Sequence, residues 1–107
     1  MNHETAQHVA EVLKAVAHPV RLQIIEALEY GEKCVGDLVE TLEIPQAAVS
    51  QQLGLMKDKD VLQCRREGTK AFYSIKNANV INLLHCVYNH CDRHVNAEEL
   101  TVERNEK

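Results

Sequence analysis

The chain has 107 residues, of which 45% are apolar and 26% charged, a composition typical of one folded domain rather than of a disordered chain. It contains no apolar run of about 18 residues and no basic N-terminal segment followed by an apolar one, which argues against a membrane span or a secretory signal and predicts a cytoplasmic location. The net charge of −4 is unevenly distributed. Residues 1–44 carry −5 and residues 77–107 carry −2, whereas residues 45–76 carry +3, so the middle third can attract phosphate.

Hydrophobic periodicity predicts four helices in the first half of the chain. They are expected over residues 4–17, from Pro19 to Gly31, over about residues 35–42 and over residues 46–57. The first helix ends before Pro19 because proline disfavours helical geometry in the residue that precedes it, and proline itself can begin the next helix. Pro45 follows a tight turn after the third helix. The third and fourth helices, joined by this short turn, have the arrangement of a helix-turn-helix.

The segment that follows alternates with the period of a β-strand. Residues 61–66 and 71–75 are strand-like, and Glu67-Gly68-Thr69-Lys70 joins them as a turn, so we expect a β-hairpin. Asn77 can cap a last helix that extends to about Asn96. These elements predict one domain over residues 1–96, followed by a flexible acidic tail over residues 97–107.

A helix-turn-helix followed by a hairpin with basic residues near its tip has the layout of a winged helix, and the sequence resembles the ArsR/SmtB family of bacterial repressors. The resemblance covers about residues 8–92 and rests on the order and spacing of His18-Pro19-Val20-Arg21-Leu22, Cys34-Val35-Gly36-Asp37-Leu38, Gln46-Ala47-Ala48-Val49-Ser50-Gln51-Gln52-Leu53, and Arg65-Arg66-Glu67-Gly68-Thr69 with Phe72-Tyr73. It implies a mainly α fold with a β-hairpin wing. It also implies a homodimer through the first and last helices that binds an inverted-repeat operator and leaves it when an inducer is sensed.

The fourth predicted helix has a side suited to reading base pairs. Its apolar side carries Val49, Leu53 and Met56. The residues that fall away from this side are small or polar, namely Gln46, Ala47, Ser50, Gln51 and Gly54. Glutamine can pair with adenine, serine can bond to a phosphate or a base, and alanine can touch a thymine methyl group. The start of the helix can receive a phosphate. These features predict double-stranded operator DNA as the partner.

The predicted hairpin adds positive charge near its tip. Its three cations are Arg65, Arg66 and Lys70. At this position they can reach flanking phosphates or the minor groove. We therefore expect replacement of Arg65 by alanine to weaken binding to all DNA sequences, whereas replacement of Gln51 by alanine relaxes the sequence preference.

Four cysteines, none in a Cys-x-x-Cys pair, are more typical of metal ligands, reactive thiols or core residues than of disulfides in a cytosolic chain. Cys86, His90 and His94 recur every four residues on one stripe of the last helix, a spacing that suits chelation. Cys91 lies on the apolar seam of this helix. It is either a sensor residue or a thiol buried in a dimer interface, where a free cysteine behaves as a small apolar residue. Cys34 begins the third helix, where a thiol can be reactive, and Cys64 is expected in the core.

The resemblance implies sensor sites whose residues are only partly present. Members that sense arsenic and cadmium have Cys-x-Cys at the start of the third helix, and here Cys34 matches the first position while Gly36 occupies the second. The four ligand positions of zinc-sensing members are here Asn77, Asn79, His90 and Arg93, so only the histidine matches. A sulfur-sensing variant pairs a cysteine of the second helix with one late in the last helix. Here Glu26 stands at the former position and Cys91 or its neighbourhood at the latter.

These features together predict a homodimeric DNA-binding repressor that is released by an inducer and needs no cofactor to bind DNA. A soft metal or metalloid such as arsenite, zinc or cadmium would engage ligands among Cys34, Cys86, His90, Cys91 and His94. The alternative is a redox or persulfide sensor that uses the thiols of Cys34, Cys86 and Cys91. An enzyme that uses Cys86, His90 and His94 is disfavoured because no general base is evident, and a winged helix used only for protein contacts is disfavoured by the positive middle third.

Overall fold

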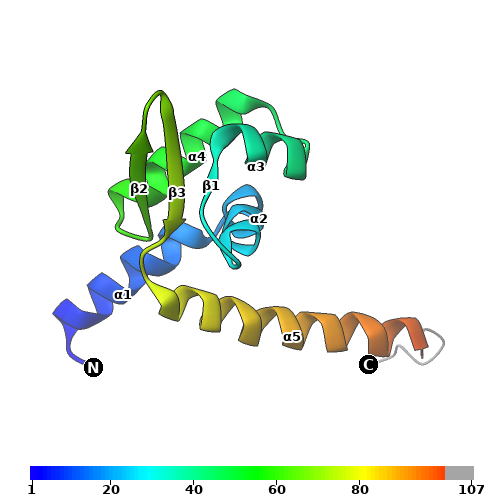
Figure 1. Ribbon diagram of the computed structural model, residues 1–107. Coiled ribbons are helices and arrows are strands. Elements are labelled where there is room, and N and C mark those ends of the chain that lie inside the picture. Colours follow the sequence, from blue (N-terminus) through cyan, green and yellow to red (C-terminus); the bar gives the residue numbers. More distant parts are fainter. Residues whose placement is uncertain (101–107) are drawn as a thin grey trace.

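The computed structural model describes residues 1–100, with side chains described through Cys91. The elements follow in the order α1 (His3–Val16), α2 (Pro19–Leu28), β1 (Lys33–Cys34), α3 (Val35–Leu42), α4 (Gln46–Asp58), β2 (Leu62–Glu67), β3 (Lys70–Ile75) and α5 (Ala78–Leu100) (Figure 1). Helices α3 and α4 form the helix-turn-helix and strands β2 and β3 form the wing, which confirms the winged helix-turn-helix. Helix α5 continues beyond its expected end at Asn96, and residues 101–107 of the predicted tail lie outside the described residues. Within the described chain, no helix has the length and apolar character needed to cross a membrane.

Local capping interactions explain where several helices begin. The Asn2 side chain accepts a hydrogen bond of 2.7 Å from the backbone N–H of Thr5 at the start of α1. Pro19 is the first residue of α2, as predicted, and the His18 side chain caps this helix by accepting from the N–H of Val20. Asn77 accepts a hydrogen bond of 3.1 Å from the N–H of Asn79, which confirms its expected place at the start of α5.

The sheet has three antiparallel strands in the order β1-β3-β2. Strands β2 and β3 are joined by a two-residue turn in which Gly68 has a φ of +63°, a conformation that glycine adopts at little cost. Strand β1 was not predicted from the sequence. It has only two residues, and its pairing of Lys33 with Tyr73 and of Cys34 with Phe72 joins segments far apart in the chain.

The core lies between α2, α3, α4 and the base of the sheet. Its fully buried large side chains are Ile24, Ile25, Leu38, Val49, Leu53, Met56, Val61 and Leu62. This set includes the three residues predicted for the apolar side of α4, which is therefore confirmed. Because these residues anchor α4 along its length, its opposite side is held toward solvent.

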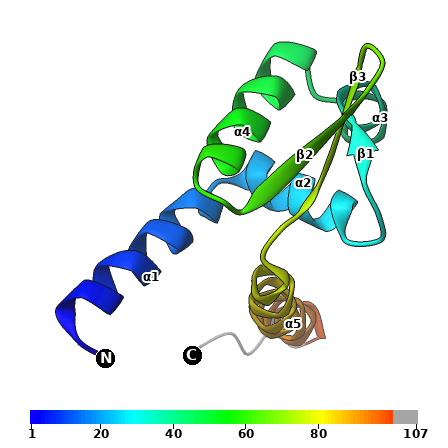
Figure 2. The same ribbon diagram turned by 60° about the vertical axis from the view of Figure 1, so that its left-hand side comes forward.

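Helices α1 and α5 extend away from this core. Both lie below the rest of the domain in Figure 1, and in Figure 2 α5 is seen nearly end-on while α1 points away from it. Several large apolar residues of the two helices are exposed, namely Val9, Leu13, Leu83, Val87 and Tyr88. A second copy of the chain can cover these side chains, which fits the interface expected for the first and last helices.

Candidate nucleic-acid interface and sensor residues

The outer side of α4 is exposed as the sequence predicts. Gln46, Ala47, Ser50 and Gln51 are exposed, and Gly54 is half-buried. A Cβ atom added at Gly54 would meet no neighbouring atom, so this position leaves open space beside the helix. Lys57 is also exposed and lies two helical turns after Ser50, on the same side. The predicted DNA-contacting residues did not include this cation of the positive middle third, although the helical period already places it on this side of α4.

The start of α4 carries no side-chain cap. Pro45 occupies the capping position, and its side chain accepts no hydrogen bond from the first turn. The first N–H groups of a helix have no partner within the helix and lie at the positive end of its dipole. An anion such as a phosphate oxygen can therefore bind here, next to the exposed Gln46 and Ala47.

The structure separates the three predicted cations of the wing. The Arg65 side chain crosses the sheet, lies 4.8 Å from the centre of the Phe72 ring, and donates hydrogen bonds to Glu32 and Glu67. Its Nε atom lies 3.2 Å from Oε1 of Glu32. Arg66 and Lys70 are exposed, and neither forms an ion pair with any residue whose side chain the structure describes. Arg66 and Lys70 are thus better placed than Arg65 to meet an external phosphate.

The contact with Arg65 holds the pKa of Glu32 below its ordinary value, chiefly through the hydrogen bond and further through the nearby positive charge. We expect the pKa of Glu32 to rise toward its ordinary value in Arg65→Met and to stay unchanged in Arg66→Met. A side-chain carboxyl titration followed by nuclear magnetic resonance measures both. Because the folded-state pKa is lowered, the pair stabilises the fold at neutral pH, and this contribution is lost as the pH falls through the folded-state pKa. An unchanged titration in Arg65→Met would contradict this assignment.

Two of the four cysteines lie near the sheet. Cys34 is half-buried at the N-cap of α3, where its side chain makes no capping hydrogen bond, and it lines a groove of about 710 Å³ between α3 and the wing. Cys64 is half-buried and lies outside the core cluster, so its expected place in the core was wrong. Leu62, Cys64 and Arg66 share one side of β2 and become progressively more exposed, because the hairpin leaves the core as it extends. Burial, together with the adjacent Cys64 thiol, raises the pKa of Tyr73 on the paired strand.

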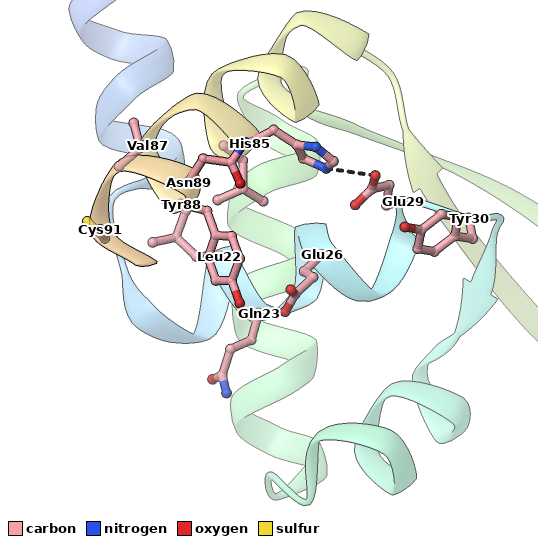
Figure 3. A pocket seen from close by; sticks show the side chains of 11 residues that line it. Leu22, Gln23, Glu26, Glu29, Tyr30, His85, Val87, Tyr88, Asn89 and Cys91 are labelled. Atoms are coloured by element: carbon pink, nitrogen blue, oxygen red, sulfur yellow. Dashed lines mark ion pairs between the residues drawn. The ribbon is translucent and has the colours of Figure 1, made fainter. Parts of the chain in front are cut away.

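The other two cysteines, Cys86 and Cys91, are exposed on α5. The alternative given for Cys91, burial in a dimer interface, is not tested by a single protomer, in which this residue lies at the edge of a groove of about 510 Å³ between α2 and α5 (Figure 3). Glu26 of α2 lines the same groove, so Glu26 and Cys91, which stand at the two cysteine positions of the sulfur-sensing variant, line one groove in the structure. At one end of the groove, His85 Nε2 lies 2.7 Å from Oε2 of Glu29 and links α5 to α2.

The proposed metal ligands are distributed over separate parts of the molecule. Cys34 and Cys91 line two grooves that share no residue. Within the part of the chain whose side chains are described, no three His, Cys, Asp or Glu side chains lie close enough together to hold a metal ion. The stripe of Cys86, His90 and His94 is not tested by this result, because the side chain of His94 lies outside the described residues.

Comparison with known proteins gives the family. The family model "Bacterial regulatory protein, arsR family" matches residues 18–63. The biofilm growth-associated repressor of Xylella fastidiosa is 36% identical over 83 residues, which are 78% of this chain and 73% of that protein. The chain belongs to the arsR family of bacterial regulatory proteins. The transcriptional repressor SmtB homolog of Synechocystis is also 36% identical, over 90 residues that cover 84% of this chain and 68% of that protein.

Solved structures place the arsR-family chain among winged helix-turn-helix domains. The homodimeric DNA-binding domain of Mb0332 from Mycobacterium bovis superposes with a TM-score of 0.75 at 31% identity, and the match covers 89% of this chain and 91% of that one. The segment matched by the family model runs from the residue before α2 into β2, so it contains the helix-turn-helix. It does not contain α5, where four of the five proposed sensor residues lie. The family therefore supports the DNA-binding module and leaves the inducer to be argued from the cysteines.

Proposed function

We propose that the chain is a transcriptional repressor that binds double-stranded operator DNA as a homodimer, with α4 in the major groove and the wing along the flanking backbone. The arrangement of α4 carries this proposal. On its apolar side, the side chains of Val49, Leu53 and Met56 are fully buried. Its opposite side presents small and polar groups to solvent. A helix held in this way can enter a groove while its scaffold stays outside. The relatives, which are named repressors, support the same function.

Each residue of the proposed interface has a chemical role that follows from its position. The amides of Gln46 and Gln51 pair with base edges, Ser50 bonds to a base or a phosphate, and Ala47 contacts a thymine methyl group. Gly54 leaves room for the DNA backbone at the half-buried end of this surface. The wing cations supply contacts that do not depend on sequence, and these are Arg65, Arg66 and Lys70. Of these, Arg65 must exchange its contact with Glu32 for a phosphate.

We further propose that the cysteines sense the inducer. Within one protomer Cys86 and Cys91 are exposed on α5 and Cys34 is half-buried beside the wing, so none of these three thiols is enclosed by the fold of the domain itself. A soft metal or metalloid such as arsenite, zinc or cadmium would bind ligands drawn from Cys34, Cys86, His90, Cys91 and His94. DNA binding itself requires no cofactor in this proposal. Ligation would change the position of α5 and thereby weaken DNA binding.

A redox or persulfide sensor is the second candidate, and the separation of the thiols favours it. Cys34 and Cys91 lie in different grooves, and the residues with described side chains hold no three-ligand cluster. Oxidation of one thiol needs no second ligand, whereas arsenite and cadmium bind tightly only where several thiolates converge. Cys91, at the groove between α2 and α5, is the thiol whose modification would most directly change the contact of these helices.

One titration separates these candidates. The reduced, metal-free protein is first used to select duplexes from a random DNA pool, and fluorescence anisotropy then follows its release from the selected duplex. We expect release by stoichiometric arsenite, and its loss when Cys86 and Cys91 are replaced with serine. Cys64→Ser is the matched control and should respond as the unaltered protein does. Release by a polysulfide but not by arsenite would establish the second candidate, and failure to bind any duplex at low salt would contradict the repressor proposal.

A further inference from the structure

Arg21, in the first turn of α2, joins three helices. Its Nη1 atom donates hydrogen bonds to the backbone oxygens of Lys14 and Ala15, at distances of 3.0 and 3.3 Å, at the end of α1. Its Nε atom donates a hydrogen bond of 2.7 Å to Oε1 of Gln52 in α4. The donors of one planar guanidinium thus connect the C-terminal end of α1 with the middle of the candidate DNA-reading helix.

The contact with α1 is favourable for a general reason. The last carbonyl groups of a helix have no partner within the helix and lie at the negative end of its dipole. A guanidinium is always charged, and its donors have fixed directions, so it can serve these carbonyls and a side-chain oxygen together. Lysine, with one compact ammonium on a flexible stem, cannot reproduce both directions.

The contact with α4 is placed where it can control orientation. Gln52 is half-buried, whereas its neighbour Gln51 is exposed on the outer side of the helix. The three fully buried residues of α4 hold it against the core through apolar contacts, and such contacts have little directional preference. The bond from Arg21 to Gln52 is directional, and it adds a constraint on the rotation of α4 relative to α1.

We propose that Arg21 is a positioning residue that, through Gln52, holds the DNA-reading helix α4 at a fixed angle to α1. This inference rests on the proposed binding of α4 to DNA. Helix α1 exposes Val9 and Leu13 and can contact a second copy of the chain, so the angle between α1 and α4 sets the distance between the two α4 helices of a homodimer. A dimer recognises the spacing of its two half-sites through this distance. Arg21 therefore controls which half-site spacing the protein accepts.

The structure offers a matched control for this proposal. Lys59, at the C-cap of α4, forms an ion pair of 3.3 Å with Glu11 of α1, so it links the same two helices. Both side chains are more than half exposed, and exposed ion pairs contribute little because they remain hydrated and screened by salt. Glu11→Gln therefore removes a link between α1 and α4 that should have little effect on their angle.

The first measurement needs no DNA. The native cysteines are replaced with serine, and spin labels are attached to cysteines introduced at Gln7 and Lys57. Dilution with unlabelled protein ensures that the labels report the distance between α1 and α4 within one protomer. We expect the distance distribution to broaden in Arg21→Lys and in Gln52→Leu. It should stay narrow in Glu11→Gln, and in Gln52→Glu, whose carboxylate still accepts from the guanidinium. An unchanged, narrow distribution in both Arg21→Lys and Gln52→Leu would overturn the proposal.

The second measurement uses an inverted repeat selected from random duplexes by the unaltered protein, and a copy in which two base pairs are inserted between the half-sites. We expect the preference for the original spacing to fall about tenfold in Gln52→Leu, the size of one charge-assisted hydrogen bond, and to persist in Glu11→Gln. A fall in affinity with the same spacing preference would mean that Gln52 only stabilises the fold or contacts DNA itself, and would overturn the proposal. If the unaltered protein selects no duplex, the proposed function fails, and the label distances still decide the role of Arg21.

Discussion

Replacing Gln51 with glutamate is expected to lower the affinity for a selected duplex by about a hundredfold, because a base contact is lost and a negative charge is brought against phosphates. Gln51 is exposed on the outer side of α4, and its side chain forms no hydrogen bond within the part of the chain whose side chains the structure describes. Glutamate has nearly the same size and helix propensity, so the free energy of unfolding should change by less than about 0.5 kcal/mol. Anisotropy on the duplex and urea unfolding of the free protein measure the two effects.

The matched control is Gln23→Glu. Gln23 is exposed on α2 and lines the groove toward α5, and its replacement changes the net charge by the same amount. If DNA lies along α4, this variant should lose only a fewfold of affinity through long-range repulsion. Equal losses in the two variants would mean that total charge rather than the α4 surface governs binding, and would contradict the proposed interface.

The α4 surface could be predicted from the sequence because every signal that defines it is local. Pro45 marks the start of the helix, and the period of Val49, Leu53 and Met56 identifies the buried side within four turns. The exposed side then follows by geometry, since a helix with one anchored side must present the other. The same reasoning placed Pro19 at the start of α2.

The side-chain partners could not be predicted, because they join residues far apart in the chain. Arg65 and Glu32 are separated by 33 positions, and Arg21 and Gln52 by 31. No periodic pattern connects such residues, and only the packing of α2, α4 and the sheet brings them together. The prediction that Arg65 meets DNA treated it as one of three equivalent cations, whereas the fold gives it acidic partners within the molecule.

The cysteines show a second limit of predicting burial from local sequence patterns. Alternation along β2 correctly placed Cys64 on the side of Leu62, but it does not report how far a hairpin extends beyond the core. The sequence also placed Cys91 on the apolar seam of α5, but it gave no sign of the groove between α2 and α5 that this residue lines. Exposure of an element depends on what packs over it, and this depends on distant segments.

Shortening Leu53 to alanine is expected to lower the free energy of unfolding by about 3 kcal/mol, because it removes a fully buried side chain from a close-packed core and leaves a cavity. This is a large part of the total stability of about 5–15 kcal/mol typical of a small domain. Urea unfolding at one fixed protein concentration measures the change, since association of two chains would add to the apparent stability.

Leu55→Ala separates the effect of burial from that of shortening a leucine in α4. Leu55 lies in the same helix two positions away and is 40% exposed, so its replacement should cost less than about 1 kcal/mol. Because the proposed base-reading side of α4 is held outward by Leu53 and its buried neighbours, Leu53→Ala should also weaken binding to the selected duplex. Similar losses of stability in both variants would show that α4 is not anchored by this side, and the orientation of the proposed DNA-reading surface would then be wrong.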